Sequence, residues 1–237
     1  PRRQNLPCGT RGPHVTPFER FAARKTAEAS AAALQPFVRE FDRTAHTLEA
    51  IGNAWSRVVA GGDFHVTPSQ DPRRPACSLV FVQSLDGNTG ADNPLTLGGG
   101  QTDKHVIYEG LSQVSADAVL AGADTIRGGD LVFSVWHPEL VSLRLTLGKP
   151  RYPVQIVATL RGVDLDRSLL FNVPEIRVVV LTVAAGASRM HEGLALRPWV
   201  QPLVMDHREE LPAAFDALRT LGIERISAVG GRHLATQ

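Results

Sequence analysis

Beyond residue 77, the chain alternates short apolar runs of strand length with longer amphipathic segments of helix length. Such runs are typical of strands that are buried on both faces. We predict strands at 78–82, 118–121, 154–158, 176–183, 203–205 and 226–229. We predict helices at 104–114 and 211–221, the second with Pro212 in its first turn and Gly222 just past its end. Strands that alternate with helices predict an α/β fold with a mainly parallel sheet flanked by helices.

The N-terminal part of the chain has a different pattern. Residues 1–17 are rich in Pro, Arg and Gly and predict an irregular segment. Residues 18–65 predict a helical extension, with Pro36 in the first turn of its second helix. We interpret this extension either as a helical hairpin packed on the next domain or as a partner surface. Residues 66–76 are Pro-rich and predict a linker, which leaves 77–237 as one α/β domain.

Bulk properties exclude several classes of protein. The formal net charge of +1 gives no reason to expect a nucleic-acid or membrane partner. Cys8 and Cys77 are too far apart in sequence to indicate a disulfide framework, so we expect a reducing compartment, the cytoplasm, and a buried Cys77. The eight histidines show no metal-ligand spacing, and we predict no metal. Because the chain starts at Pro1 and stops soon after Gly230-Gly231, we expect a fragment lacking sequence at both ends.

Residues with chemical potential follow the predicted strands. In open α/β sheets, ligands bind beyond the carboxyl ends of the strands. Ser84 and Asp86 follow the first strand, before a glycine that permits a tight turn. Thr125 and Arg127 lie in a glycine-rich segment after the second, and Arg127 suits a phosphate. An ordinary Asp-Gly turn and a flexible glycine loop explain the same residues equally well.

Two further strand ends complete this pattern. Thr159 follows the third predicted strand. Gly230-Gly231 follows the last, where free N–H groups at a helix start would bind phosphate. A single Gly-Gly pair fits many turns. The prediction of a ligand site therefore requires several such loops on one edge of the sheet.

Together these stretches resemble the reductase domain of the bifunctional deaminase/reductase of riboflavin biosynthesis, and its stand-alone pyrimidine-reductase relatives. The similarity covers about residues 75–237. The similar stretches are SLDG at 84–87, ADAVLAGADTIR at 116–127, PVQIV at 153–157 and LRTLGIERISAVGG at 218–231. The resemblance implies a dihydrofolate-reductase-like fold and NADPH as hydride donor. It also implies a small-molecule substrate, a pyrimidine with a ribosylamino phosphate, and it is compatible with a homodimer.

The resemblance also implies roles for individual residues. Asp86 is the candidate catalytic residue, which would orient the substrate or relay a proton. Ser84 and Thr96 fall on the substrate side. The residues implied on the cofactor side are Val82, Gly122, Thr125, Arg127, Thr159, Gly230, Gly231, Arg232, His233, Leu234 and Ala235.

The chain departs from the family pattern at substrate-side positions. Gln113 stands where the family usually has an Arg, and 129–131 replace an acidic pair and a Pro. Trp136-His137 lie where a further Arg is usual, and Val229 replaces a Glu. Because Gln or Trp does not replace the bidentate grip of Arg on phosphate, we expect an altered substrate or reduced activity. The alternatives are a non-catalytic nucleotide-binding or interaction homologue, or a fragment that does not fold stably.

Overall fold

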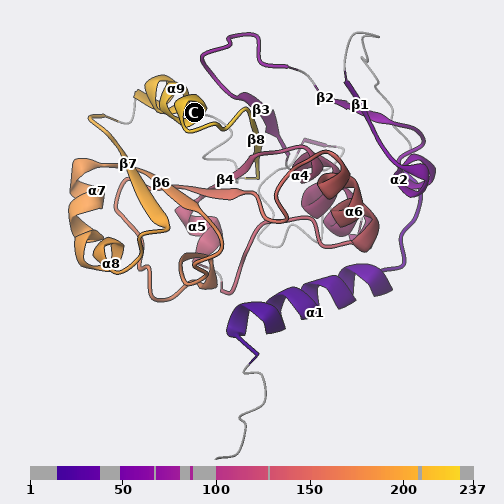
Figure 1. Cartoon of the computed structure of the whole chain (residues 1–237), viewed down its shortest axis with the longest axis horizontal. Coiled ribbons are helices and arrows are strands. Elements are labelled where there is room, and N and C mark those ends of the chain that lie inside the picture. The colour runs from indigo at the N-terminus through magenta and orange to yellow at the C-terminus, as the bar shows by residue number, and fades with distance from the viewer. Residues whose placement is uncertain are drawn as a thin grey trace, which may run out of the picture.

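The structure is a computed structural model that describes residues 15–37, 49–66, 68–80, 86–87, 100–127, 129–207 and 210–229. These residues form a six-stranded sheet surrounded by helices, and a separate two-stranded sheet (Figure 1). The described part of the chain has no helix long and apolar enough to cross a membrane.

All pairings in the large sheet are parallel, which confirms the predicted α/β class. The strand order is β3-β8-β4-β5-β6-β7. The strands are β3 (Ala76–Leu79), β4 (Ala118–Gly122), β5 (Val154–Ala158), β6 (Val178–Val183), β7 (Val200–Met205) and β8 (Arg225–Ala228). Cys77 lies on the edge strand β3 and is exposed, so the expectation of a buried thiol is wrong.

The chain reverses its direction across the sheet after β7. It first moves outward from β4 through β5 and β6, then returns through α9 (Leu211–Thr220) to insert β8 beside β4. Ala214 and Leu218 of α9 pack on Leu120, on the sheet face opposite to that of Val119 and Ala121. The reversal places a topological switch point between β4 and β8, where ligands of such sheets bind.

The predicted helix at 104–114 is present, but most of it is π-helical. It consists of α3 (Gly100–Thr102), the π-helix η2 (Asp103–Leu111) and α4 (Ser112–Val114). Ser112 Oγ and Gln113 Nε2 both donate to the Tyr108 carbonyl oxygen, at 3.1 and 2.9 Å. Side chains thus satisfy a carbonyl that the wider helical turn leaves available.

Shorter helices fill the connections between the strands. Pro138 lies in the first turn of α6, where a missing N–H costs little. These helices are α5 (Ala123–Ile126), α6 (Pro138–Thr146), η3 (Leu169–Phe171), α7 (Ala184–Arg189) and α8 (His191–Ala195).

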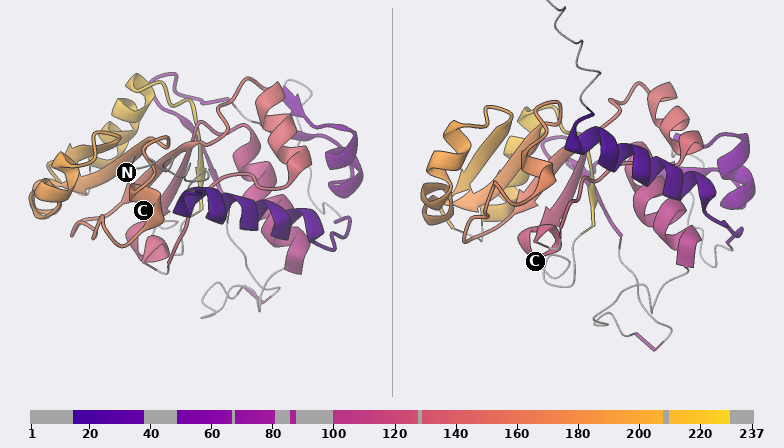
Figure 2. Two further views of the ribbon diagram at one scale, coloured as in Figure 1. Left: turned by 60° about the horizontal axis from the view of Figure 1, so that its bottom comes forward. Right: turned by 90° about the horizontal axis from the view of Figure 1, so that it is seen from below.

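The N-terminal helix α1 (Pro17–Ala31) begins with a capping box between Thr16 and Glu19. Its Phe21 packs edge-on against the buried Trp136, with ring centroids 5.5 Å apart. Figure 2 shows α1 lying lengthwise along the side of the molecule. The helix is therefore packed on the α/β core and does not project from it.

The second predicted N-terminal helix is wrong in the described residues. Residues 32–37, including Pro36, have no regular structure. Further along, β1 (Glu49–Ile51) pairs antiparallel with β2 (Phe64–Val66), and the short α2 (Ala54–Val59) lies between them. Ile51 of β1 packs in one apolar cluster with Leu140 of α6, so tertiary contact overrides local helical preference here.

Candidate functional site

The carboxyl ends of β4 and β5 lie side by side. Gly122 and Ala158 are register partners at the ends of these strands. The helix α5 starts directly after β4, with Gly122 as its N-cap, and the segment 159–168 follows β5. Among the residues that the structure describes, a Cβ placed on Gly122 would meet no atom within 4 Å, so no described side chain fills the space beside this backbone.

A pocket of about 240 Å³ lies between α5 and the segment after β5. Its walls are largely apolar, because Ile126, Val163 and Phe171 line it. The full lining is Ala123, Ile126, Arg127, Val163, Asp164, Arg167, Ser168 and Phe171. The pocket thus opens at the sheet edge where strand topology favours a ligand.

Hydrogen bonds from Asn172 and Arg197 stabilise the segment after β5, which forms one wall of the pocket. Asn172 Nδ2 donates to the carbonyl oxygens of Leu165 and Ser168, at 2.9 and 2.8 Å. The buried Arg197 donates from Nε and Nη2 to Asn172 Oδ1, and from Nη2 to Asp166 Oδ1. The main chain around Ser168 is therefore fixed by these hydrogen bonds.

Ser168 is the unusual member of the pocket. The residue is only 5% exposed, and its hydroxyl has no hydrogen-bond partner within the part of the chain that the structure describes. A buried polar group left unpaired costs about 1–3 kcal/mol. Its oxygen is inaccessible to solvent, so the hydroxyl lies within the wall and is not exposed to the pocket.

Two arginines of the pocket form exposed ion pairs. Arg127 Nη1 lies 2.7 Å from Asp124 Oδ1, and Arg167 Nε lies 3.0 Å from Asp164 Oδ2. The arginine side chains are 59% and 86% exposed. Since exposed pairs contribute only about 0–1 kcal/mol, an anionic ligand would displace these carboxylates at little cost.

The site residues predicted from the sequence at the ends of β4 and β5 lie at this edge of the sheet, but not all of them line the pocket. Arg127 lines the pocket, whereas Gly122, Thr125 and Thr159 are not among its lining residues. Thr159 Oγ1 donates to the Gly162 carbonyl oxygen at 3.1 Å and so closes the turn after β5. Gly162 has a φ of +76° and packs against the α7 backbone, so only glycine fits there easily.

The turn predicted after β3 is described only at Asp86 and Gly87. Gly87 has a φ of 87°, the left-handed conformation that a tight turn uses, and Asp86 is exposed. The other predicted site residues lie outside the described residues. They are Val82, Ser84, Thr96, Gly230, Gly231, Arg232, His233, Leu234 and Ala235.

Three of the residues that depart from the family pattern lie in the interior, whereas 129–131 are exposed or half-buried. Gln113 is buried, and its side-chain amide is committed to the Tyr108 carbonyl. Trp136 and Val229 are buried in apolar clusters. His137 caps α6, accepting at Nδ1 from the Glu139 N–H, and burial lowers its pKa.

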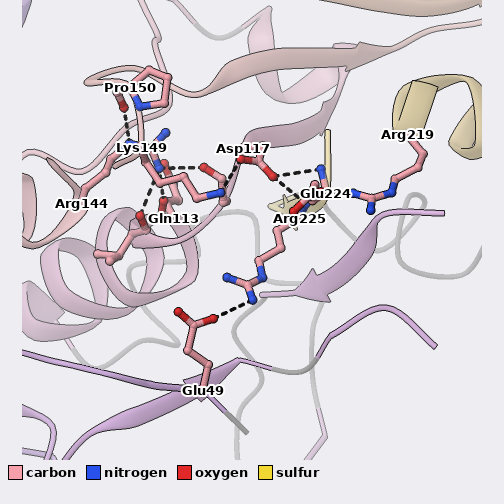
Figure 3. A network of polar contacts seen from close by, with 11 residues as sticks. Glu49, Gln113, Asp117, Arg144, Lys149, Pro150, Arg219, Glu224 and Arg225 are labelled. Atoms are coloured by element: carbon pink, nitrogen blue, oxygen red, sulfur yellow. Dashed lines mark hydrogen bonds and ion pairs between the residues drawn. The ribbon is translucent and has the colours of Figure 1, made fainter. Parts of the chain in front are cut away.

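The opposite edge of the sheet carries a polar network (Figure 3). Buried Arg144 donates to four main-chain carbonyl oxygens, and burial lowers its pKa to about 10. Asp117 accepts from Lys149 and from the N–H groups of Glu224 and Arg225. These contacts join the amino ends of β4 and β8, so we interpret the network as structural. Among the described residues, no group of three or more His, Cys, Asp or Glu side chains could hold a metal.

Comparisons with known proteins agree with this arrangement. A model of the family described as the RibD C-terminal domain matches residues 75–237. A pyrimidine reductase-like protein from Corynebacterium diphtheriae is similar in structure, with 23% identity and a TM-score of 0.51 over 74% of this chain and 72% of that one. No protein with curated annotation matches the chain significantly.

Two longer proteins are also similar. RibD of Acinetobacter baumannii has 20% identity and a TM-score of 0.50, over 69% of this chain and 42% of that one. A diaminohydroxyphosphoribosylaminopyrimidine deaminase/5-amino-6-(5-phosphoribosylamino)uracil reductase of Thermotoga maritima has 21% identity and a TM-score of 0.43, over 67% and 40%. The chain thus spans about two fifths of the length of these two proteins.

Proposed function

The chain belongs to the RibD C-terminal domain family, and from this premise we propose that it is a pyrimidine reductase-like oxidoreductase that uses NADPH. The observation that carries the proposal is the pocket at the carboxyl edge of β4 and β5, bounded by α5 with Arg127 and by Ser168. Bound NADPH would supply the hydride, while the protein would position the substrate and exclude water.

The residues present fit a dinucleotide. No described side chain fills the space beside Gly122, which would let a ligand come close to the backbone there. The guanidinium groups at the pocket are groups that nucleotides engage. We propose that Gly122, Thr125, Arg127 and Thr159 form this side of the cofactor site. The remaining proposed cofactor residues are Val82, Gly230, Gly231, Arg232, His233, Leu234 and Ala235.

We propose that the substrate differs from the 5-amino-6-(5-phosphoribosylamino)uracil named for the Thermotoga maritima protein. The burial of Gln113, Trp136 and Val229 supports this, because none of these side chains is a charged group that would grip phosphate or base. Ser84 and Thr96 are proposed to contact the substrate. Asp86, exposed on its turn, is proposed to orient it or relay a proton.

The assembly and location of the protein are further parts of the proposal. A homodimer in the cytoplasm is consistent with the family and with the free thiol of Cys77. The alternative function is a non-catalytic nucleotide-binding or interaction homologue, which the altered substrate-side residues also favour.

The first test is a titration of the purified chain with NADPH, followed by nicotinamide fluorescence. We expect saturable binding that weakens in Thr125→Ala and Gly231→Asp. Thr146→Ala, on the exposed side of α6, is the matched control and should bind like the wild type. A folded chain that binds no NADPH would contradict the reductase proposal. Saturable binding without hydride transfer to any pyrimidine tested would favour the non-catalytic alternative.

A further inference from the structure

We propose that residues 17–37, which comprise α1 and the chain that follows it, form a clamp that holds η2 in its π-helical form. These residues lie outside the part of the chain that matches the family model, so they are not part of the domain that the family shares. The N-terminal clamp would make the geometry of the candidate site depend on residues that are not themselves in the site.

The N-terminal clamp contacts the helix at three points along its length. At the start, Thr102 Oγ1 accepts from the Gln35 N–H at 2.8 Å and donates to the Gln35 carbonyl oxygen at 3.1 Å. Two ion pairs follow along the helix, Glu28–Lys104 at 3.7 Å and the buried pair Lys25–Glu109. The two ion pairs fall within the π-helical residues 103–111, and the Thr102 bonds lie directly before them.

The helix α1 is anchored to the core independently of η2. Phe18 packs edge-on against Tyr152 and Phe21 against Trp136, with ring centroids 5.1 and 5.5 Å apart. Figure 2 shows that α1 keeps this lengthwise position along the side of the molecule in both views. Because these ring contacts do not involve η2, α1 can serve as a fixed support for it.

A π-helix as long as η2 needs such support. Its nine residues exceed the single turn in which π-helices mostly occur inside α-helices. The same helix is α-helical at both ends, in α3 and α4, where the clamp forms no ion pair. The α-helical form is therefore the alternative state of η2.

The C-terminal end of η2 is fixed to α6, so a change of helical form must move its N-terminal end. Arg144 of α6 donates to the carbonyl oxygens of Gln113 and Val114, at 2.7 and 3.2 Å. Gly110 lies so close to α6 that a Cβ there would come within 2.7 Å of Leu140 Cδ1. An α-turn uses i→i+4 hydrogen bonds and a π-turn i→i+5, so conversion would rotate and shift the residues before this anchor.

Movement of η2 would reach the candidate site in two ways. The turn at Asp86 and Gly87 is the described segment that precedes this helix in sequence. Tyr108 of η2 also packs against the core cluster that includes Ile126 and Phe171 of the pocket wall. The consequence for the site rests on the proposed function, whereas the contacts of the clamp do not.

NMR couplings across hydrogen bonds test the clamp, because they identify the carbonyl oxygen that accepts each N–H. We expect i→i+5 couplings in η2 of the wild type. Thr102→Val removes both bonds to Gln35, and Lys25→Met/Glu109→Gln removes the ion pair without leaving a buried charge. Both variants should replace i→i+5 by i→i+4 couplings. Their η2 amides should exchange about tenfold faster, while those of α9 are unchanged.

Two control variants carry matched changes away from these contacts. Thr146→Val makes the same change at an exposed threonine of α6, whose hydroxyl bonds to the Ser142 carbonyl of its own helix. Ser30→Ala removes an exposed hydroxyl of α1 that bonds to the Thr26 carbonyl. Both controls should behave like the wild type. Unchanged i→i+5 couplings in both clamp variants, or an equal rise of exchange in η2 and α9, would overturn the clamp.

A titration with NADPH separates the clamp from the proposed function. We expect the clamp variants to bind NADPH about fivefold more weakly than the wild type and the two controls. Equal affinities, with altered couplings in η2, would overturn the consequence for the site. If the folded wild type does not bind NADPH, the proposed function fails, and the NMR couplings still decide whether the clamp holds η2.

Discussion

At the scale of single residues, buried polar groups at both ends of the sheet are only partly paired among the described residues. At the amino ends, Arg144 donates to four carbonyl oxygens and Asp117 accepts from a lysine and two N–H groups. At the carboxyl ends, the Ser168 hydroxyl lacks a described partner. Arg144 Nη2 and Gln113 Oε1 also lack a described partner, so unpaired buried groups occur at both ends and each is retained at a cost. An unpaired buried atom alone therefore does not mark a ligand site in this fold.

The cap of α6 leads to a prediction about pH. His137 accepts the Glu139 N–H at Nδ1 while its ring stacks on Trp55, 4.1 Å away, and burial lowers its pKa. The folded state thus resists a proton that the unfolded state takes up near pH 6.5, the ordinary value. Stability is fully present above this pH and falls as the pH drops through the lowered value.

We expect His137→Asn to reduce this dependence, because Asn also caps helices and does not titrate. His137→Ala should cost about 1 kcal/mol at neutral pH, the usual value of an N-cap. Urea unfolding from neutral to acidic pH measures both. Parallel stability curves for the wild type and the Asn variant would show that His137 contributes nothing to the acid sensitivity.

At the scale of elements, α1 lies outside the residues that match the family model but is packed on its core. Lys25 of α1 is buried and pairs with Glu109 of η2, whose carboxylate also accepts from His105 Nδ1 at 3.1 Å. A buried charge that loses its partner is costly, while removing both charges is often neutral. This pair therefore tests whether α1 belongs to the folded unit.

Lys25→Met should lower the free energy of unfolding by about 3–5 kcal/mol, because Glu109 is left buried without its cation. The double variant Lys25→Met/Glu109→Gln should recover most of that loss, since the amide still bonds to His105 and carries no charge. Chemical denaturation measures both. A small effect of the single variant would indicate that α1 detaches readily from the core.

Helices and strands were predictable where the local sequence pattern alone determines them. The run at 154–158 corresponds to β5 because a short, mostly apolar run rich in β-branched residues is typical of a buried strand. The three-residue strands β1 and β2 have too little sequence to show alternation. The residues of β1 were therefore predicted as helix, and those of β2 fell at the boundary between the predicted extension and the linker. The π-helical turn of η2 was missed because apolar spacing alone does not separate it from an α-helix.

At the scale of the whole molecule, the site follows from topology more than from motifs. The mainly parallel sheet was predicted from the alternation of elements. The strand order, with the reversal after β7, was not predicted, and it is this order that brings the ends of β4 and β5 together. Arg127 was predicted from its glycine-rich setting. Ser168 and Arg167 were not, because they lie well after β5 and nothing in the sequence marks a hydroxyl that the fold leaves unpaired.

The same topology depends on a long-range contact at the opposite edge. Asp117 binds the start of β8. Its Oδ2 accepts from the N–H groups of Glu224 and Arg225, both at 2.9 Å. Its Oδ1 pairs with Lys149 at 2.6 Å. One side chain thus joins the segments before β4, β5 and β8, which are distant in sequence.

Asp117→Ala should cost about 3 kcal/mol of stability, because two N–H groups and a lysine lose their acceptor together. The Glu224 and Arg225 amides should also exchange their hydrogens faster than in the wild type, since the start of β8 is released. Glu49→Gln is the matched control. Glu49 also contacts β8, but it accepts from the Arg225 guanidinium, at 2.8 Å, and not from a main-chain N–H. It should cost less than about 1 kcal/mol and leave amide exchange unchanged. Equal effects of the two variants would mean that the insertion of β8 depends on its apolar packing and not on Asp117.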